Sequence, residues 1–233
     1  MSDHGQITGH AQLETLDIIP AEFGRASIGS FSGIYLHDVS DARKAEVVDW
    51  LVQQDFCGPV FASNAEGRAI AGALPWSSVR NDHPRGADVG FTLRATNSSE
   101  QYGPDLDTCI FAARITPGGG MHGGLNRGEL STVPAAQGPA YRKAFRSETP
   151  CWLPDIIPTV LTTMDLTTEG SEGRPLVEAL VGDDPRFGVA PAVGTRTLTA
   201  ERHGHEQYLR QWIIEGKTIV DCGWTEGTGA RSR

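Results

Sequence analysis

The sequence predicts an α/β fold, because segments with strand-like and helix-like patterns alternate along the chain. Near the N-terminus, a short apolar strand at residues 33–37 precedes a helix at 40–54, and a second buried strand follows at 60–62. A strand–helix–strand unit of this kind predicts a parallel crossover. The 28 glycines and 14 prolines indicate large connecting loops, which in α/β proteins often carry the functional site.

The helix at residues 40–54 is predicted from its apolar stripe, with polar side chains on the other positions. Ser40 is a suitable N-cap, and Gly58-Pro59 prevents the helix from continuing. The stripe consists of Val47, Val48, Leu51 and Val52.

The remaining elements are assigned from shorter patterns. Residues 6–30 show no clear period and are expected to be irregular. Residues 89–93 alternate apolar and polar side chains, as in a half-exposed strand, and residues 109–115 and 130–136 are expected to form further strands. Residues 207–214 and 217–224 flank Glu215-Gly216 and predict a hairpin that completes a sheet edge.

A second helix is expected at residues 155–164. Pro158 lies in its first turn, where the missing N–H breaks no helical hydrogen bond. The apolar side chains that we expect to pack this helix on a sheet are Ile157, Val160, Leu161 and Met164.

The composition is that of a globular domain. The chain has 233 residues, of which 39% are hydrophobic, so one domain at residues 1–224 is expected, with a disordered tail at 225–233. No apolar run approaches the roughly 18 residues of a membrane helix. The net charge of −9 argues against DNA or RNA as a partner.

The four cysteines are far apart and form neither a zinc motif nor a clear disulfide framework. We expect them to be small buried side chains, and a disulfide in an exported protein is the alternative. They are Cys57, Cys109, Cys151 and Cys222.

Two short segments have the composition of a metal site. Residues 2–5 read Ser-Asp-His-Gly, in which a carboxylate and an imidazole can face one cleft where the chain turns. Residues 117–126 read PGGGMHGGLN, in which glycines surround His122 and allow backbone and ligand to approach closely. Asp3, His4 and His122 are therefore the candidate metal ligands.

These segments, with the two that follow, resemble the alkaline phosphatase superfamily in its type I phosphodiesterase/nucleotide pyrophosphatase branch. After the glycine-rich histidine segment the chain reads ELSTVPAAQGPAYRKAF at residues 129–145, where the family has a strand similar to "VAAQGPAF+K". It then reads LPDIIPTVLTTMDL at 153–166, where the family has a helix similar to "DIAPTIL". The order and spacing of the four segments agree with the family.

The resemblance implies the C-terminal part of an alkaline-phosphatase-like three-layer sandwich with two divalent metal ions, for which an Asp/His ligand set favours zinc. Asp3 and His4 would bind one ion and His122 the other. The reaction implied is hydrolysis of a small phosphodiester or nucleotide pyrophosphate through a covalent phospho-Thr or phospho-Ser intermediate. Asn126 and Arg127 follow the histidine loop and are candidates for contacting the phosphate.

In the family, the nucleophile and the other metal ligands precede Ser-Asp-His-Gly, whereas here only Met1 precedes Ser2. We therefore expect a fragment of a longer hydrolase that is inactive alone. The alternatives are a non-catalytic remnant or subunit that binds metal weakly or pairs with a separate N-terminal half, and a chain that aggregates through an exposed sheet edge. A sulfatase or phosphomutase of the same superfamily is less favoured. Localisation stays open between cytoplasmic and exported.

Other polar residues are more typical of exposed positions than of a site. His10 is expected in a solvated loop, and His37-Asp38 at a strand end. His203 and His205 are expected on a polar loop, and Arg142 and Lys143 in a basic turn.

Overall fold

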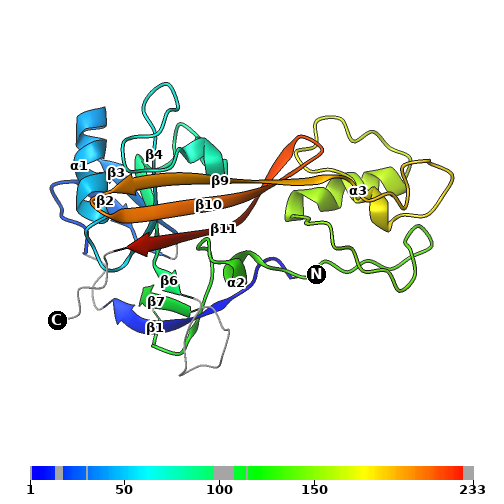
Figure 1. Cartoon of the computed structure of the whole chain (residues 1–233), viewed down its shortest axis with the longest axis horizontal. Coiled ribbons are helices and arrows are strands. Elements are labelled where there is room, and N and C mark those ends of the chain that lie inside the picture. Colours follow the sequence, from blue (N-terminus) through cyan, green and yellow to red (C-terminus); the bar gives the residue numbers. More distant parts are fainter. Residues whose placement is uncertain (1, 14–17, 30, 97–107, 114, 228–233) are drawn as a thin grey trace. The chain divides into compact units, whose positions relative to one another are not determined.

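The structure is a computed structural model that describes residues 2–13, 18–29, 31–96, 108–113 and 115–227, with backbone only at 10–13, 96, 108–113 and 227. Over these residues the fold is mixed α/β, with three sheets and few helices (Figure 1). Its residues form two compact units. Unit 1 comprises residues 1–3, 132–196 and 210–220, and unit 2 comprises residues 4–131, 197–209 and 221–233.

The helices are α1 (Asp41–Leu51), α2 (Arg127–Leu130) and α3 (Ile156–Thr163), with 3-10 turns at Trp76–Val79, Leu153–Asp155 and Val177–Ala179. The strands are β1 (Ile7–Leu13), β2 (Gly24–Ser27), β3 (Phe31–Leu36), β4 (Cys57–Ala62), β5 (Val89–Leu93), β6 (Ala95–Thr96), β7 (Thr108–Ala113), β8 (Gly120–Met121), β9 (Val193–Arg202), β10 (His205–Ile214) and β11 (Lys217–Gly227).

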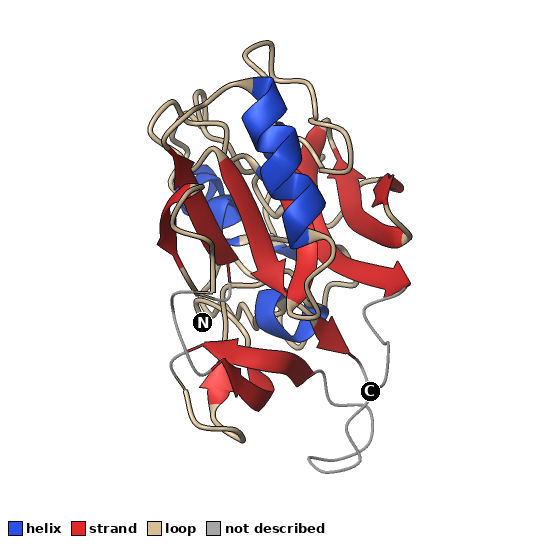
Figure 2. Cartoon of the chain, turned by 90° about the vertical axis from the view of Figure 1, so that its left-hand side faces the viewer, coloured by secondary structure: helices blue, strands red, loops and turns tan. Residues whose placement is uncertain are grey.

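The core of unit 2 lies between α1 and a four-stranded sheet with the order β2-β3-β5-β4. Figure 2 shows α1 lying against strands. Ser40 caps α1 as expected, since its side chain accepts a hydrogen bond from the Arg43 N–H. The apolar stripe also packs as expected: Val47, Val48 and Leu51 are fully buried.

The predicted parallel orientation of the two strands that flank α1 is confirmed. Both β3 and β4 pair antiparallel with β5, so β3 and β4 run parallel to each other with β5 between them. The expected half-exposed character of residues 89–93 is wrong, because all five residues of β5 are buried. A central strand covered on both faces loses the alternation of exposure that an edge strand would have.

A second sheet of unit 2 has the order β6-β7-β1-β8, in which β1 pairs parallel with β7 and antiparallel with β8. The strand expected at residues 109–115 is confirmed as β7. The irregular segment expected at 6–30 is wrong, because β1 and β2 both lie within it. Two short strands separated by a segment of mixed polarity produce no sustained period.

The third sheet has the order β11-β10-β9, and its strands contribute residues to both units. The hairpin around Glu215-Gly216 is confirmed as β10 and β11, with Glu215 in the left-handed region at φ 48°. β10 also pairs with β9, which the sequence analysis did not identify. Residues 225–227, expected in the tail, belong to β11, and residues 228–233 lie outside the described part of the chain.

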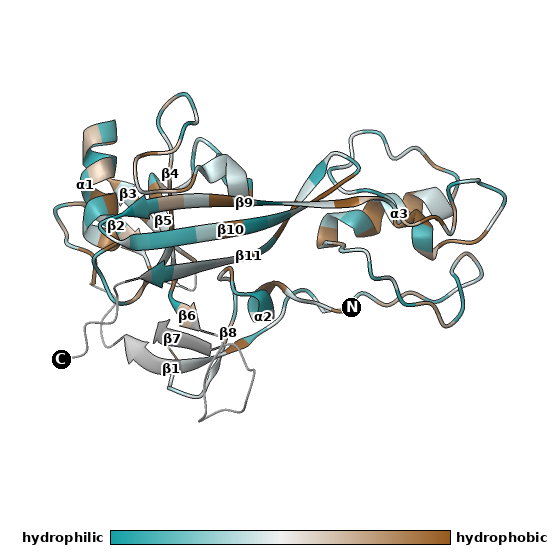
Figure 3. Cartoon of the chain, in the orientation of Figure 1, coloured by the Kyte–Doolittle hydropathy of each residue, from teal (hydrophilic) through white to brown (hydrophobic). Residues whose placement is uncertain are grey.

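Unit 1 contains the second predicted helix, which is confirmed as the 3-10 turn at Leu153–Asp155 followed by α3. The packing expected for it is wrong. Ile157, Val160 and Met164 are exposed and Leu161 is half-buried, whereas Pro158 and Thr159 are buried. The apolar residues are visible as brown segments of α3 in Figure 3.

The strand expected at residues 130–136 is also wrong. Residues 127–130 form the short helix α2, and residues 131–137 have no regular secondary structure. Among the described residues, none of the helices has the length and apolar character needed to cross a membrane.

Candidate metal centre

His4 and His122 lie side by side in unit 2 because of the pairing of β1 with β8. Ile7 pairs with Met121 in antiparallel register. The residues before Ile7 therefore lie beside the residues after Met121, which brings His4 next to His122. The turn into β8 is fixed by two backbone hydrogen bonds, from the Gly9 N–H to the Gly119 carbonyl (2.9 Å) and from the Gly118 N–H to the Gly9 carbonyl (2.7 Å).

The two imidazoles stack, with ring centroids 3.7 Å apart and planes inclined by 16°. His122 is exposed and His4 is half-buried. Nδ1 of His4 lies 2.8 Å from the Gly5 carbonyl oxygen. A carbonyl can only accept, so Nδ1 carries the proton and Nε2 has the lone pair in the neutral ring. This is the tautomer in which Nε2 can bind a metal ion.

The remaining sequence candidates occupy different surroundings. Asp3 directly precedes His4 in the chain; it is exposed and belongs to unit 1. Asn126 is buried and caps α2 by accepting the Gly128 N–H at 2.9 Å. Arg127 is exposed and donates to Asp221 of β11 at 3.0 Å. The structure thus gives Asn126 and Arg127 contacts that hold α2 in place.

The donor chemistry suits zinc, but the set is incomplete. A zinc site takes four ligands, or three protein ligands and a water. Within the described part of the chain, no three His, Cys, Asp or Glu side chains come together in a metal-binding arrangement. The stacked pair supplies two nitrogen donors, so further ligands would be needed for tight binding.

The other histidines follow the expectations in part. Asp38, beside His37 at the end of β3, accepts from the backbone N–H and hydroxyl of Ser40, as expected for a polar strand end. His203 is exposed in the turn between β9 and β10. His205 is not exposed, which corrects the prediction: it is the first residue of β10 and only 8% of its surface is accessible. Burial lowers the pKa of His205. The side chain of His10 lies outside the described residues.

The basic turn agrees with the expectation, whereas the burial expected for the cysteines is confirmed for Cys57 and wrong for Cys151 and Cys222. Arg142 and Lys143 are exposed, although Arg142 also donates to the Glu178 carbonyl at 3.1 Å. Cys57 is buried, and burial raises the pKa of its thiol. Cys151 and Cys222 are half-buried free thiols, and the side chain of Cys109 is outside the described residues.

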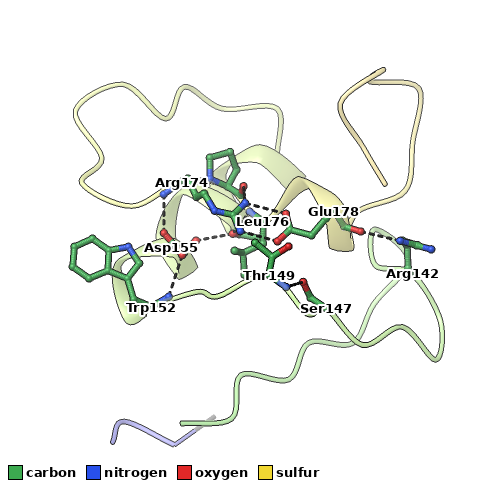
Figure 4. Close-up of polar contacts among 10 residues, drawn as sticks. Arg142, Ser147, Thr149, Trp152, Asp155, Arg174, Leu176 and Glu178 are labelled. Carbon is green, nitrogen blue, oxygen red and sulfur yellow. Dashed lines mark hydrogen bonds and ion pairs between the residues drawn. The ribbon is translucent and has the colours of Figure 1, made fainter. Parts of the chain in front are cut away.

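Unit 1 contains a buried ionic cluster that the sequence analysis missed. Arg174 and Glu178 have 2% exposed side chains and form two hydrogen bonds, of 2.9 and 2.7 Å. Asp155 is fully buried beside them and accepts the backbone N–H groups of Arg174 (2.8 Å) and Trp152 (3.1 Å) (Figure 4). Burial raises the pKa of Asp155. The Asp155 carboxylate joins the Trp152 and Arg174 segments, and Arg174 pairs with Glu178 four residues further along, so we assign the cluster a structural role.

The sequence analysis also missed Glu129, which is buried and bonded to the His122 loop. Its sequence pattern was visible: Asn126 and Glu129 have the three-residue spacing of a capping box, which the structure contains at α2. No family model, no curated protein and no solved structure matches this chain.

Proposed function

We propose that this chain carries metal ligands of a two-metal hydrolase that acts on small phosphodiesters or nucleotide pyrophosphates, with the three-layer sandwich of the alkaline phosphatase superfamily. His4 and Asp3 would serve one divalent ion and His122 the other, with zinc the favoured metal. The proposal is supported by the four sequence segments described above and by one feature of the structure, the stacking of His4 on His122.

The geometry of the stack favours two ions over one shared ion. The lone pair of an imidazole nitrogen lies in the plane of the ring. Two stacked rings inclined by only 16° therefore direct their lone pairs within two separate, nearly parallel planes and do not converge on one point. Their separation of 3.7 Å is close to the roughly 3.5–4 Å between the metals of two-metal phosphoesterases. Each ring is thus suited to a different ion of such a pair.

The residues of this chain would hold and orient the ions. The Gly5 carbonyl fixes the His4 tautomer by accepting from Nδ1 at 2.8 Å, which increases the basicity of Nε2. The exposure of His122 leaves its ring accessible from solvent. The metal pair, when bound, supplies charge stabilisation at the phosphoryl oxygens. The proposal assigns metal binding, and no nucleophilic role, to residues of this chain.

Zinc binding tests the proposal directly. Isothermal titration of the full chain with zinc should give binding that His122→Ala and His4→Ala each weaken. His83→Ala is the matched control, because His83 is an exposed histidine of unit 2 with no part in the proposed site. Equal zinc binding by His122→Ala, His83→Ala and the unaltered chain would refute the metal assignment.

Hydrolysis assays test the reaction. Any cleavage of bis-p-nitrophenyl phosphate by the chain in the presence of zinc should be abolished by His122→Ala. If the chain binds zinc through His4 and His122 but cleaves neither the diester nor p-nitrophenyl phosphate, the chain is a metal-binding subunit or remnant. Cleavage that His122→Ala leaves unchanged would refute the proposed site.

A further inference from the structure

We infer that Glu129 is the positioning residue of the candidate metal centre, and that it holds the His4 and His122 segments in their stacked arrangement. The expected effect on metal binding rests on the proposed function. The stacked arrangement itself does not, because it is stabilised by hydrogen bonds that Glu129 makes through both its side chain and its backbone.

The carboxylate of Glu129 holds the His122 loop. The side chain is buried, with 5% of the residue exposed. Its Oε1 accepts the Gly124 N–H at 2.9 Å and its Oε2 accepts the Asn126 N–H at 3.3 Å. Gly124 lies two residues after His122, so the carboxylate fixes the backbone immediately beyond the ring. Hydrogen bonds from backbone N–H groups to a buried carboxylate are among the stronger ones in proteins.

Gly124 itself is adapted to this carboxylate. A Cβ atom at Gly124 would lie 2.4 Å from Oε2 of Glu129 and 2.9 Å from Oε1. Only a residue without a side chain allows the carboxylate to approach so closely. The loop and the glutamate therefore fit each other.

The backbone of Glu129 holds the His4 segment. Its carbonyl oxygen accepts the Gly5 N–H at 2.9 Å. The contact is close-packed, because a Cβ atom at Gly5 would lie 2.0 Å from the Gly128 carbonyl oxygen. Gly5 directly follows His4, whose Nδ1 is bonded to the Gly5 carbonyl. One residue thus binds the chain next to each of the two histidines.

The chemistry of the two N–H donors requires a carboxylate. Two donors converge on Glu129, and a carboxylate offers two acceptor oxygens. Glutamine offers one acceptor oxygen and places an NH₂ group against the other N–H. Aspartate keeps the charge but is one methylene shorter, and alanine removes both acceptors. We therefore expect positioning to decrease from glutamate to glutamine and aspartate, and to be lost in alanine.

The test measures ring proximity without metal. In the full chain with ¹³C-labelled histidine, the nuclear Overhauser cross-peaks between the His4 and His122 rings, assigned with His4→Gln and His122→Gln, report the stack. We expect Glu129→Ala to lose these cross-peaks and Glu129→Gln to weaken them. Glu66→Ala is the control, since Glu66 is an exposed glutamate of unit 2 whose side chain bonds to Asn64 and Arg68. It should keep the cross-peaks.

Zinc titration of the same variants gives the second measurement. Loss of a supporting contact around a metal ligand commonly weakens binding by about 10- to 100-fold. We expect that loss in Glu129→Ala and a smaller one in Glu129→Gln, with circular dichroism confirming that both remain folded. If Glu129→Ala does not fold, the Glu129→Gln and Glu129→Asp cross-peaks decide.

The outcomes separate the two proposals. Cross-peaks of unaltered intensity in Glu129→Gln and Glu129→Asp, or in a folded Glu129→Ala, would overturn the positioning role, whatever the zinc result. Cross-peaks that are lost in the variants of a chain that never binds zinc would support the positioning role and refute the proposed function.

Discussion

The buried ion pair between Arg174 and Glu178 gives the sharpest stability prediction for unit 1. The change is Glu178→Ala. It leaves the Arg174 guanidinium, whose side chain is 2% exposed, without the carboxylate that accepts two of its hydrogen bonds. The guanidinium cannot lose its charge at any ordinary pH, because the pKa of arginine is above about 12. A positive charge would therefore stay buried in unit 1.

The expected cost follows from the burial and geometry of the pair. Removing one partner of a fully buried pair costs about 3–5 kcal/mol, because the remaining charge has lost its water and its partner. The double variant Arg174→Met/Glu178→Leu removes both charges and fills the space with apolar groups of similar size. It should cost much less, and can even be neutral.

Amide hydrogen exchange at unit 1 measures this cost locally. The Arg174 and Leu176 amides donate to Asp155 and Thr159 inside the cluster. Since each 1.4 kcal/mol is about a tenfold change in an equilibrium constant, their exchange in Glu178→Ala should be faster by roughly a thousandfold. Exchange that is less than about tenfold faster in Glu178→Ala, or equally fast in the single and double variants, would refute the reasoning.

Three further predictions concern unit 2. Gly5→Ala places a methyl group 2.0 Å from the Gly128 carbonyl oxygen, so it should cost about 1–3 kcal/mol in urea unfolding and separate the stacked histidines. Gly90→Ala places a methyl group 2.2 Å from the Trp76 ring and should cost a similar amount without affecting the stack, as the histidine cross-peaks would show. Burial lowers the pKa of His205 in the folded chain, so between that pKa and about 6.5 the unfolded chain binds more protons. The contribution of His205 to the free energy of unfolding should therefore be complete above about pH 6.5 and be lost as the pH falls through the folded-state pKa. In a series of urea unfolding curves, His205→Gln should remove this pH dependence of the free energy of unfolding.

The sequence determined the elements whose patterns are local. Ser40 and the apolar stripe of α1 specify where that helix begins and which face it buries, since capping and periodicity act within a few residues. The hairpin at Glu215-Gly216 was equally local, because a tight turn between two apolar segments depends on the turn residues. The motifs around His4 and His122 also identified the two histidines that the structure brings together.

Burial and pairing between distant segments were decided by the tertiary structure. β5 has the alternation of a half-exposed strand but is buried on both faces, because α1 and the aromatic side chains around Trp76 cover it. The apolar residues of α3 were expected to be buried, yet they are exposed while Pro158 and Thr159 are buried. The spacing of apolar residues along a helix or strand identifies an apolar face, but it does not predict which segment will cover that face.

The candidate metal centre shows the same division. The sequence by itself supplied His4, His122 and the glycines around them, because side-chain chemistry and backbone freedom are properties of the residues. The antiparallel register of Ile7 with Met121 and the hydrogen bond from the Gly5 N–H to the Glu129 carbonyl were decided by the tertiary structure. Both join segments more than a hundred residues apart and leave no local pattern, whereas the capping-box spacing of Asn126 and Glu129 was visible in the sequence. The sequence therefore identified His4 and His122, but it did not predict that their ring centroids lie 3.7 Å apart.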